Sequence, residues 1–174
     1  GWEVCNRVCG IYTVLRTKAP QMVAQRGDDY ALLGPLNRNS AQVEFEEAEV
    51  PPHIEAGVQA LRERGVHSVA GRWLVQGRPL AVLIDLSTLR TEIPQLRKAY
   101  NDAYGLISDP TDSLTGDALA FGEGTKIFIR GVQAALGESK LIVHFHEWQA
   151  ATGLAALAKN DRYPKTIFTT HATL

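Results

Sequence analysis

The stretch that most constrains the fold is Leu141–Trp148, which reads LIVHFHEW. Its three branched apolar residues follow the turn-like Gly137-Glu138-Ser139, a pattern typical of a buried strand in a parallel sheet. The strand then gives way to His144, His146 and Glu147, and a helical pattern begins directly afterwards. Open α/β sheets bind ligands at the carboxyl ends of their strands. These three polar residues are therefore the first candidates for chemistry.

The rest of the chain alternates between strand and helix patterns. Besides the central strand, strands are expected at residues 2–4, 30–33, 67–75, 79–86 and 165–170. Helices are expected at residues 11–25, 54–64, 92–104, 117–136 and 148–158. Two of the strands form a hairpin around Gln76-Gly77-Arg78, Gly65 caps a helix, and Pro20 should break or restart the first helix. The acidic stretch 42–52 is interpreted as a solvated connection, and 108–116 as a loop. This alternation predicts an α/β sandwich with a mostly parallel sheet.

Composition narrows the class of protein. The 174 residues suffice for one ordinary domain, and 45% of them are hydrophobic. A net charge of -1 argues against a nucleic-acid binder or a membrane-surface protein. The sequence lacks an apolar run of membrane-spanning length and a signal-peptide pattern, so a cytoplasmic protein is expected. Both ends read as cut, because Gly1–Val4 has the pattern of a strand tail and Leu174 directly follows a strand.

The first candidate site is Arg7-Val8-Cys9-Gly10-Ile11, between a strand end and a helix. A helix N-terminus offers unpaired N–H groups and a partial positive charge, which suit a phosphate. Gly10 has no Cβ, so an anion can approach the backbone, and Arg7 can add a bidentate contact. The plainer interpretation, favoured on these residues alone, is that Gly10 permits a tight turn and Arg7 is a solvated charge.

The second candidate site is His144 to Glu147. His144 and His146 share a strand face, and Glu147 lies at the strand-to-helix junction. Two imidazoles and a carboxylate could bind zinc in a metallohydrolase, but the segment completes neither HxHxDH nor HExxH, so no metal is expected. His144 is better interpreted as a core histidine hydrogen-bonded to the backbone. Glu147 is expected to hold a polar ligand group or to cap the next helix.

The third candidate is His171, which also directly follows an apolar strand. It and the pair His146-Glu147 are expected to face one crevice, where a neutral histidine can donate to a substrate hydroxyl. The alternative is a capping or surface histidine. Elsewhere, Trp73 is expected in the core, and Cys5 and Cys9 are interpreted as small apolar fillers rather than redox partners.

Short motifs extend along the whole chain: Trp2-Glu3-Val4, Asn6–Leu15, Lys18-Ala19-Pro20, Leu33–Asn37, Arg64–His67, Gly71–Leu74, Ile84-Asp85-Leu86, His144–Trp148 and Thr166–Leu174. Together and in this order they resemble the glycogen (starch) synthases of the animal and fungal type. The last two motifs are the strongest. One departure is Cys9-Gly10, where the family usually has two adjacent glycines; a side chain at Cys9 narrows the approach to phosphate.

The resemblance implies an architecture and a reaction. Such enzymes are similar in having two Rossmann-like domains that face a cleft, the GT-B arrangement. They transfer glucose from UDP- or ADP-glucose to the non-reducing end of an α-1,4-glucan, with retention and without a metal or other cofactor. Residues 1–174 would then be a truncated N-terminal domain, Rossmann-like and three-layered, without the second domain and inactive alone. The full-length protein would be a possible homo-oligomer, with no nucleic-acid or membrane partner.

The resemblance also implies roles for the candidate residues. His171 matches the active-site histidine near the donor glucose, and Glu147 matches an acidic position that lines the sugar pocket. Arg7 is implied near the nucleotide diphosphate, Gly10 in the loop over it, and His146 among the donor-binding residues. The alternative hypothesis is a catalytically inactive Rossmann domain that binds a nucleotide or a protein partner.

Overall fold

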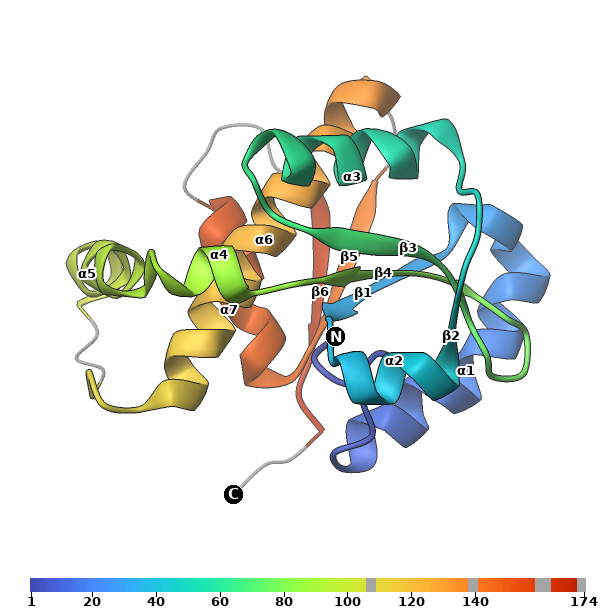
Figure 1. The fold of residues 1–174 in the computed structure, drawn as a ribbon, viewed down its shortest axis with the longest axis horizontal. Coiled ribbons are helices and arrows are strands. Elements are labelled where there is room, and N and C mark those ends of the chain that lie inside the picture. The colour runs from blue at the N-terminus through green and yellow to red at the C-terminus, as the bar shows by residue number, and fades with distance from the viewer. Residues whose placement is uncertain (106–108, 138–140, 159–163, 172–174) are drawn as a thin grey trace.

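The structure is a computed structural model and describes residues 1–105, 109–137, 141–158 and 164–171 (Figure 1). Its strands form a four-stranded sheet in the order β1-β4-β3-β2 and a separate two-stranded sheet, β5-β6. The strands are β1 (Ala31–Pro35), β2 (Phe45–Glu47), β3 (Ser68–Trp73), β4 (Leu80–Ile84), β5 (Ile142–His146) and β6 (Lys165–Thr169). The pairs β1-β4 and β5-β6 are parallel, whereas β2-β3 and β3-β4 are antiparallel.

The expected α/β class is confirmed, but the expectation of a mostly parallel sheet is wrong. The β3-β4 hairpin was expected and is present, and its short connection imposes an antiparallel pair. A second antiparallel pair arises inside 42–52, which is not simply a solvated connection because it contains β2. There Gly71 allows a close backbone approach, since a Cβ atom at this position would lie 2.0 Å from the carbonyl oxygen of Glu46.

Helices cover both faces of the four-stranded sheet (Figure 1). They are α1 (Gly10–Arg26), α2 (Arg38–Glu44), α3 (Pro52–Glu63), α4 (Ser87–Arg90), α5 (Ile93–Tyr104), α6 (Ser113–Leu136) and α7 (Glu147–Ala158), with a 3₁₀ turn at Gly27–Asp29. The long helix α6 packs against both α3 and α7. Within the described residues, no helix combines the length and apolarity needed to cross a membrane.

Several helix boundaries differ from expectation for local reasons. Pro20 lies inside α1 without ending it. Helix α6 begins at Ser113, within the expected loop, because the carboxylate of Asp112 accepts the backbone N–H groups of Leu114 and Thr115 as an N-cap. Gly65 has a φ of +69°, which confirms it as the residue that ends α3. Residues 2–5 form a turn, so the expected strand at residues 2–4 is wrong.

Strand β4 is the centre of the core. Each of its residues is 0% exposed, with Val82 and Ile84 in a cluster shared with α3 and α6, and Ala81 and Leu83 in a cluster shared with α1. Trp73 is also 0% exposed, as expected. By contrast, the central strand predicted from the sequence is only partly buried: Ile142 of β5 is 57% exposed, and the expected turn before it falls mostly outside the described residues.

Glycines permit the closest contacts between helices. A Cβ atom at Gly122 of α6 would lie 2.7 Å from the backbone carbonyl carbon of Thr152 on α7. Backbone cannot move aside as a flexible side chain can, so the distance between α6 and α7 depends on this position lacking a side chain. Since α7 begins directly after β5, the same contact fixes where β5 ends.

We expect Gly122→Ala to lower the free energy of unfolding by about 1–3 kcal/mol, because the added methyl group overpacks the α6-α7 contact. Urea denaturation followed by circular dichroism measures this change. Gly10→Ala is the matched control: a Cβ atom there meets nothing within 4 Å. Equal stability of the two variants would contradict the role assigned to Gly122.

Candidate functional site

The parallel pairing of β5 and β6 brings two of the candidate segments together. His146 pairs with Thr169 at the last position of both strands, so Glu147 and the Thr170-His171 segment leave the sheet side by side. His171 is exposed at this edge, and Glu147 is half-buried. His171 contacts both His146 and Glu147 directly, so the expected proximity of these residues is confirmed, while the crevice that they were expected to face stays a prediction.

Glu147 holds the segment that carries His171. Its Oε1 atom accepts a hydrogen bond from the backbone N–H of His171 and lies 3.4 Å from the hydroxyl oxygen of Thr170. The backbone of Glu147 has a φ of +65°, in the left-handed region that glutamate rarely adopts. Such a conformation costs about 1–2 kcal/mol and persists only where surrounding contacts impose it. Glu147 thus combines backbone strain with a specific contact to the tip of β6.

Three imidazoles, which we call the histidine cluster (His144, His146 and His171), stack beside this contact. The ring centroids of His144 and His146 are 4.1 Å apart, and those of His146 and His171 are 5.2 Å apart. The Nδ1 atom of His146 lies 2.9 Å from Nε2 of His171, so one of these nitrogens donates to the other. This hydrogen bond fixes the orientation of the exposed His171 ring.

Lys18 of α1 determines the tautomer of His144. Its Nζ atom lies 3.2 Å from Nδ1 of His144, and an ammonium group can only donate. His144 therefore accepts at Nδ1 and carries its proton on Nε2, which lies 2.7 Å from the hydroxyl oxygen of Thr169. His144 is bonded to side chains rather than to backbone, which corrects the core-histidine interpretation.

Burial keeps the inner members of the histidine cluster neutral. His146 is only 5% exposed. Its burial, followed by the nearby charge of His144, lowers its pKa from the ordinary value of 6.5 to about 3. The pKa of His144 is also lowered, first by burial and then by Lys18. At neutral pH both rings are therefore uncharged.

The turn at Arg7–Gly10 differs from the expected open anion site. The buried carboxylate of Glu3 accepts hydrogen bonds from the backbone N–H groups of Cys9, at 2.7 Å, and Tyr12, at 3.0 Å. Burial alone would raise the pKa of Glu3, but these bonds and one from the Cys9 thiol hold it below its ordinary value. A carboxylate of the chain itself thus occupies the amino end of α1.

The two residues expected to bind phosphate are both exposed. Arg7 lies over the ring of Tyr12, with its guanidinium carbon 5.9 Å from the ring centroid. Gly10 begins α1 in open surroundings, so the fold itself does not require a glycine there. Cys9 is exposed, which makes the apolar-filler interpretation wrong for Cys9, while Cys5 is buried as expected.

The N-terminal segment connects this turn to the carboxyl end of β1. The side-chain amide of Asn37 donates to Asn6 at 3.1 Å, and the nitrogen of Gly1 donates to the carbonyl oxygen of Leu33 at 2.8 Å. The turn therefore lies at the edge where β1 and β4 end. In the part of the chain that the structure describes, no group of three or more His, Cys, Asp or Glu residues is placed to hold a metal ion.

Two contributors to this site were missed by the sequence analysis. Glu3 was read as part of a strand, and no local pattern marks a carboxylate that returns to cap a helix six residues later. Lys18 contacts His144 across 126 residues, a pairing that only the tertiary fold reveals.

Comparison with known proteins adds a decisive observation. A family model described as glycogen synthase matches residues 1–174, the whole chain. The chain belongs to the glycogen synthase family. It is 40% identical over 173 residues to the glycogen (starch) synthase of Neurospora crassa. It is 38% identical to isoform 1 of that enzyme in Saccharomyces cerevisiae and 35% identical to the liver enzyme of Mus musculus.

The matches extend over nearly all of this chain but only part of each relative. They cover 99% of the chain and 24%, 26% and 25% of the three relatives respectively. The chain thus spans about a quarter of the length of these members of the glycogen synthase family, and the family resemblance inferred from the sequence motifs is confirmed.

We expect the stability of the chain to fall as the pH is lowered from about 7 to about 5. The pKa of His146 is about 3 in the folded state and 6.5 ordinarily, so the unfolded state binds more protons between these values. The loss attributable to His146 at pH 5 is about 2 kcal/mol. Urea denaturation at both pH values should show a smaller fall in the free energy of unfolding for His146→Gln than for the wild type. If the free energy of unfolding of His146→Gln fell as much as that of the wild type, the pH dependence could not be attributed to His146.

Proposed function

We propose that this chain is part of the N-terminal, Rossmann-like domain of a retaining glucosyltransferase with GT-B architecture. The complete protein transfers glucose from UDP- or ADP-glucose to the non-reducing end of an α-1,4-glucan, without a metal ion. The observation that carries this proposal is the exposed His171, oriented by His146 and held by Glu147 at the ends of two parallel strands, in a member of the glycogen synthase family.

The chemistry is the stabilisation of a separating ion pair. Positive charge develops at the anomeric carbon of glucose while negative charge grows on the departing diphosphate. The imidazole of His171 forms a hydrogen bond with a hydroxyl group of the donor glucose and so orients the sugar. Groups fixed before the reaction stabilise such charge without reorganising at the moment of transfer. The contacts of His171 with Glu147 and His146 provide that fixation.

Glu147 and His146 act through His171 in this proposal. The Oε1 atom of Glu147 already accepts the His171 backbone N–H, so this carboxylate positions the tip of β6 rather than transferring protons. His146 was expected to bind the donor directly. Its burial instead favours a positioning role, exerted through the 2.9 Å contact with His171.

Arg7 and the amino end of α1 serve the diphosphate. Arg7 is exposed, and its contact with Tyr12 is worth only about 0.5–1 kcal/mol at such a site, so the guanidinium can turn to an anion at little cost. The carboxylate of Glu3 already accepts the backbone N–H of Cys9 and would repel a phosphate there. Phosphate binding therefore depends more on Gly10 and Arg7 than it would if the Cys9 N–H were free. The remaining cationic groups come from the second domain of the complete protein.

A second candidate function is nucleotide or protein binding without catalysis. The contacts of Glu3 with Cys9 favour it, because they fill part of the expected phosphate site. Glucose transfer by the complete protein distinguishes the two candidates, since a binding module transfers none. Residues 1–174 form only one wall of the proposed cleft and are inactive by themselves. The complete protein is a possible homo-oligomer.

In the complete protein, His171→Ala should lower the kcat for glucose transfer about 100-fold, because a pre-oriented group beside the donor sugar is lost. The exposed side chain contributes little to stability, so the melting temperature should stay within a few degrees of the wild type. Incorporation of labelled glucose into glycogen measures the rate, and His53→Ala is the control. A wild-type rate in His171→Ala would refute the role given to His171.

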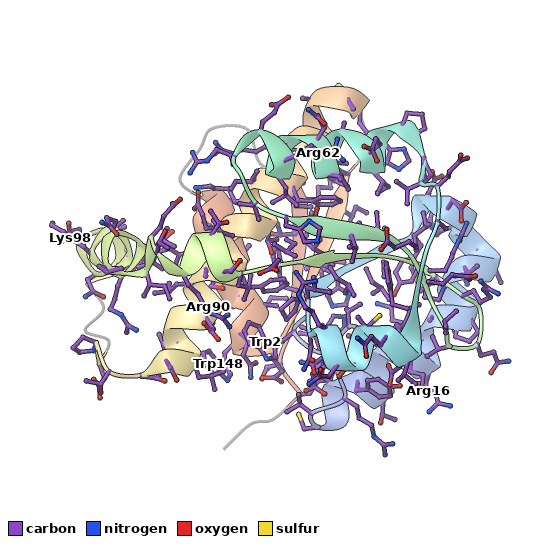
Figure 2. The ribbon with its side chains drawn as sticks, in the orientation of Figure 1. Trp2, Arg16, Arg62, Arg90, Lys98 and Trp148 are labelled. Atoms are coloured by element: carbon purple, nitrogen blue, oxygen red, sulfur yellow. The ribbon has the colours of Figure 1, made fainter. Side chains whose placement is uncertain are left out.

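Arg7→Ala should weaken the binding of UDP to the complete protein about tenfold, through loss of a charge-assisted hydrogen bond to phosphate. Calorimetric titration with UDP measures this affinity. Arg16→Ala, on the exposed side of α1, is the matched control (Figure 2). Undiminished UDP affinity in Arg7→Ala would remove Arg7 from the donor site.

A further inference from the structure

A polar cavity of about 330 Å³ lies at the carboxyl ends of β1 and β4, outside the histidine cluster. Its walls come from the N-terminal segment, from the residues that follow each strand, and from α4 and α6: Trp2, Asn6, Pro35, Leu36, Asn37, Arg38, Asp85, Leu86, Arg90 and Asp117. This volume is at the lower end of the range for small-molecule sites in proteins. It suits a ligand group about the size of one sugar ring.

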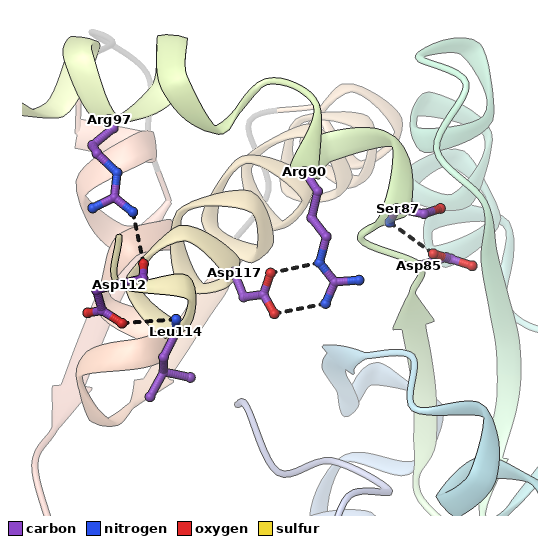
Figure 3. Close-up of polar contacts among 7 residues, drawn as sticks. All are labelled: Asp85, Ser87, Arg90, Arg97, Asp112, Leu114 and Asp117. Carbon is purple, nitrogen blue, oxygen red and sulfur yellow. Dashed lines mark hydrogen bonds and ion pairs between the residues drawn. The ribbon is translucent and has the colours of Figure 1, made fainter. Parts of the chain in front are cut away.

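Two arginine–aspartate pairs face the cavity. Arg90 donates through Nε and Nη2 to the two carboxylate oxygens of Asp117, at 2.7 and 2.8 Å, as a parallel fork (Figure 3). Arg38 donates to Oδ2 of Asp85 at 2.9 Å. The other oxygen of Asp85 accepts the backbone N–H of Ser87, so this carboxylate is fixed in position as well.

The pairing of charges selects the class of ligand. Two guanidinium groups face two carboxylates, so the wall formed by these pairs has no net charge. Each arginine is already bound to a carboxylate, and a phosphate would have to compete with that carboxylate for it. A neutral hydroxyl group avoids this competition, because it donates to a carboxylate lone pair or accepts from a remaining guanidinium N–H. The walls therefore favour an uncharged, polyhydroxylated ligand over a nucleotide diphosphate.

The rest of the lining agrees with such a ligand. Asn6 and Asn37 add amide groups, joined by a 3.1 Å hydrogen bond. Trp2 adds an aromatic surface, and its ring is fixed by an edge contact with Phe121 at a centroid distance of 5.7 Å. Fixed aromatic surface beside paired polar groups is what a sugar ring, with apolar C–H faces and polar edges, requires. Trp2 and Arg90 lie close together in Figure 2, in agreement with their shared cavity.

We propose that this cavity is a subsite for a glucose unit of the glucan acceptor, with Arg38, Asp85, Arg90 and Asp117 binding its hydroxyl groups and Trp2 contacting its ring. The inference rests on the proposed function and adds to it a location for the acceptor. The acceptor subsite lies beside Asn6, where β1 and β4 end, and is distinct from the ends of β5 and β6, where His171 is assigned to the donor sugar.

The test compares affinities for a neutral oligosaccharide and for a nucleotide in the complete protein. Arg38→Ala and Arg90→Lys should each weaken the binding of maltoheptaose about tenfold, because each removes hydrogen bonds from a charged group. The affinity for UDP should not change in either variant. Isothermal titration calorimetry measures both ligands.

Arg62→Ala is the matched control. Arg62 on α3 is also an exposed arginine paired with a carboxylate, at 3.8 Å from Glu55, and its side chain is 65% exposed against 68% for Arg38. Arg62 lies on another part of the molecule in Figure 2. The Arg62→Ala variant should therefore bind maltoheptaose as tightly as the wild type does. If Arg90→Lys disturbs folding, Arg38→Ala decides alone, since its side chain is mostly in solvent.

Two results would contradict the proposed subsite. In the first, Arg38→Ala binds maltoheptaose as tightly as the wild type does. In the second, Arg38→Ala binds UDP more weakly while its affinity for maltoheptaose is unchanged. Failure of the proposed function gives a different result. In that case the wild-type protein transfers no glucose from either UDP-glucose or ADP-glucose, while Arg38→Ala still weakens the binding of maltoheptaose.

Discussion

The candidate site depends on one contact, that between the carboxylate of Glu147 and the backbone N–H of His171. It joins the residue that follows β5 to the residues that follow β6, and it is made by a side chain whose backbone is in the left-handed region. A strained conformation is retained where the surrounding structure imposes it, and such positions gather at functional sites. Without this contact, the residues that follow β6 would not be held against β5, and the ring of His171 would lose its orientation toward His146.

The scaffold behind this contact is assembled from helix packing as much as from the sheets. Strand β4 is buried on both faces, and α6 connects the core beneath it to α7 through the close approach at Gly122. Since α7 begins at Glu147, the position of that residue follows from the α6-α7 packing. On the other face, α1 brings Lys18 to His144 and places its own amino end beside the carboxyl end of β1. The strand ends thus offer two fixed polar places, one at His171 and one at the Arg90–Asp117 pair.

Sequence patterns predicted the elements better than their arrangement. Helical spacing located α1, α3 and α7, and the position after a strand marked Glu147 and His171 correctly as neighbours. The same rule applied to Asp85, which directly follows β4, would have pointed to the cavity there. Sheet direction was predicted less well, because the antiparallel strand β2 is short and lies in an acidic stretch without an apolar pattern. The Glu3 cap and the Lys18 contact could not be predicted, since each depends on chain segments that meet only in the fold.

The central claim is that Glu147 acts by holding His171, and the rate of glucose transfer in Glu147→Gly tests it most directly. Glycine adopts a φ of +65° without strain, so this variant keeps the backbone turn while it loses the carboxylate. The account predicts that transfer by the complete protein falls about 100-fold while the melting temperature is retained. Transfer at the wild-type rate in a folded Glu147→Gly protein would contradict it.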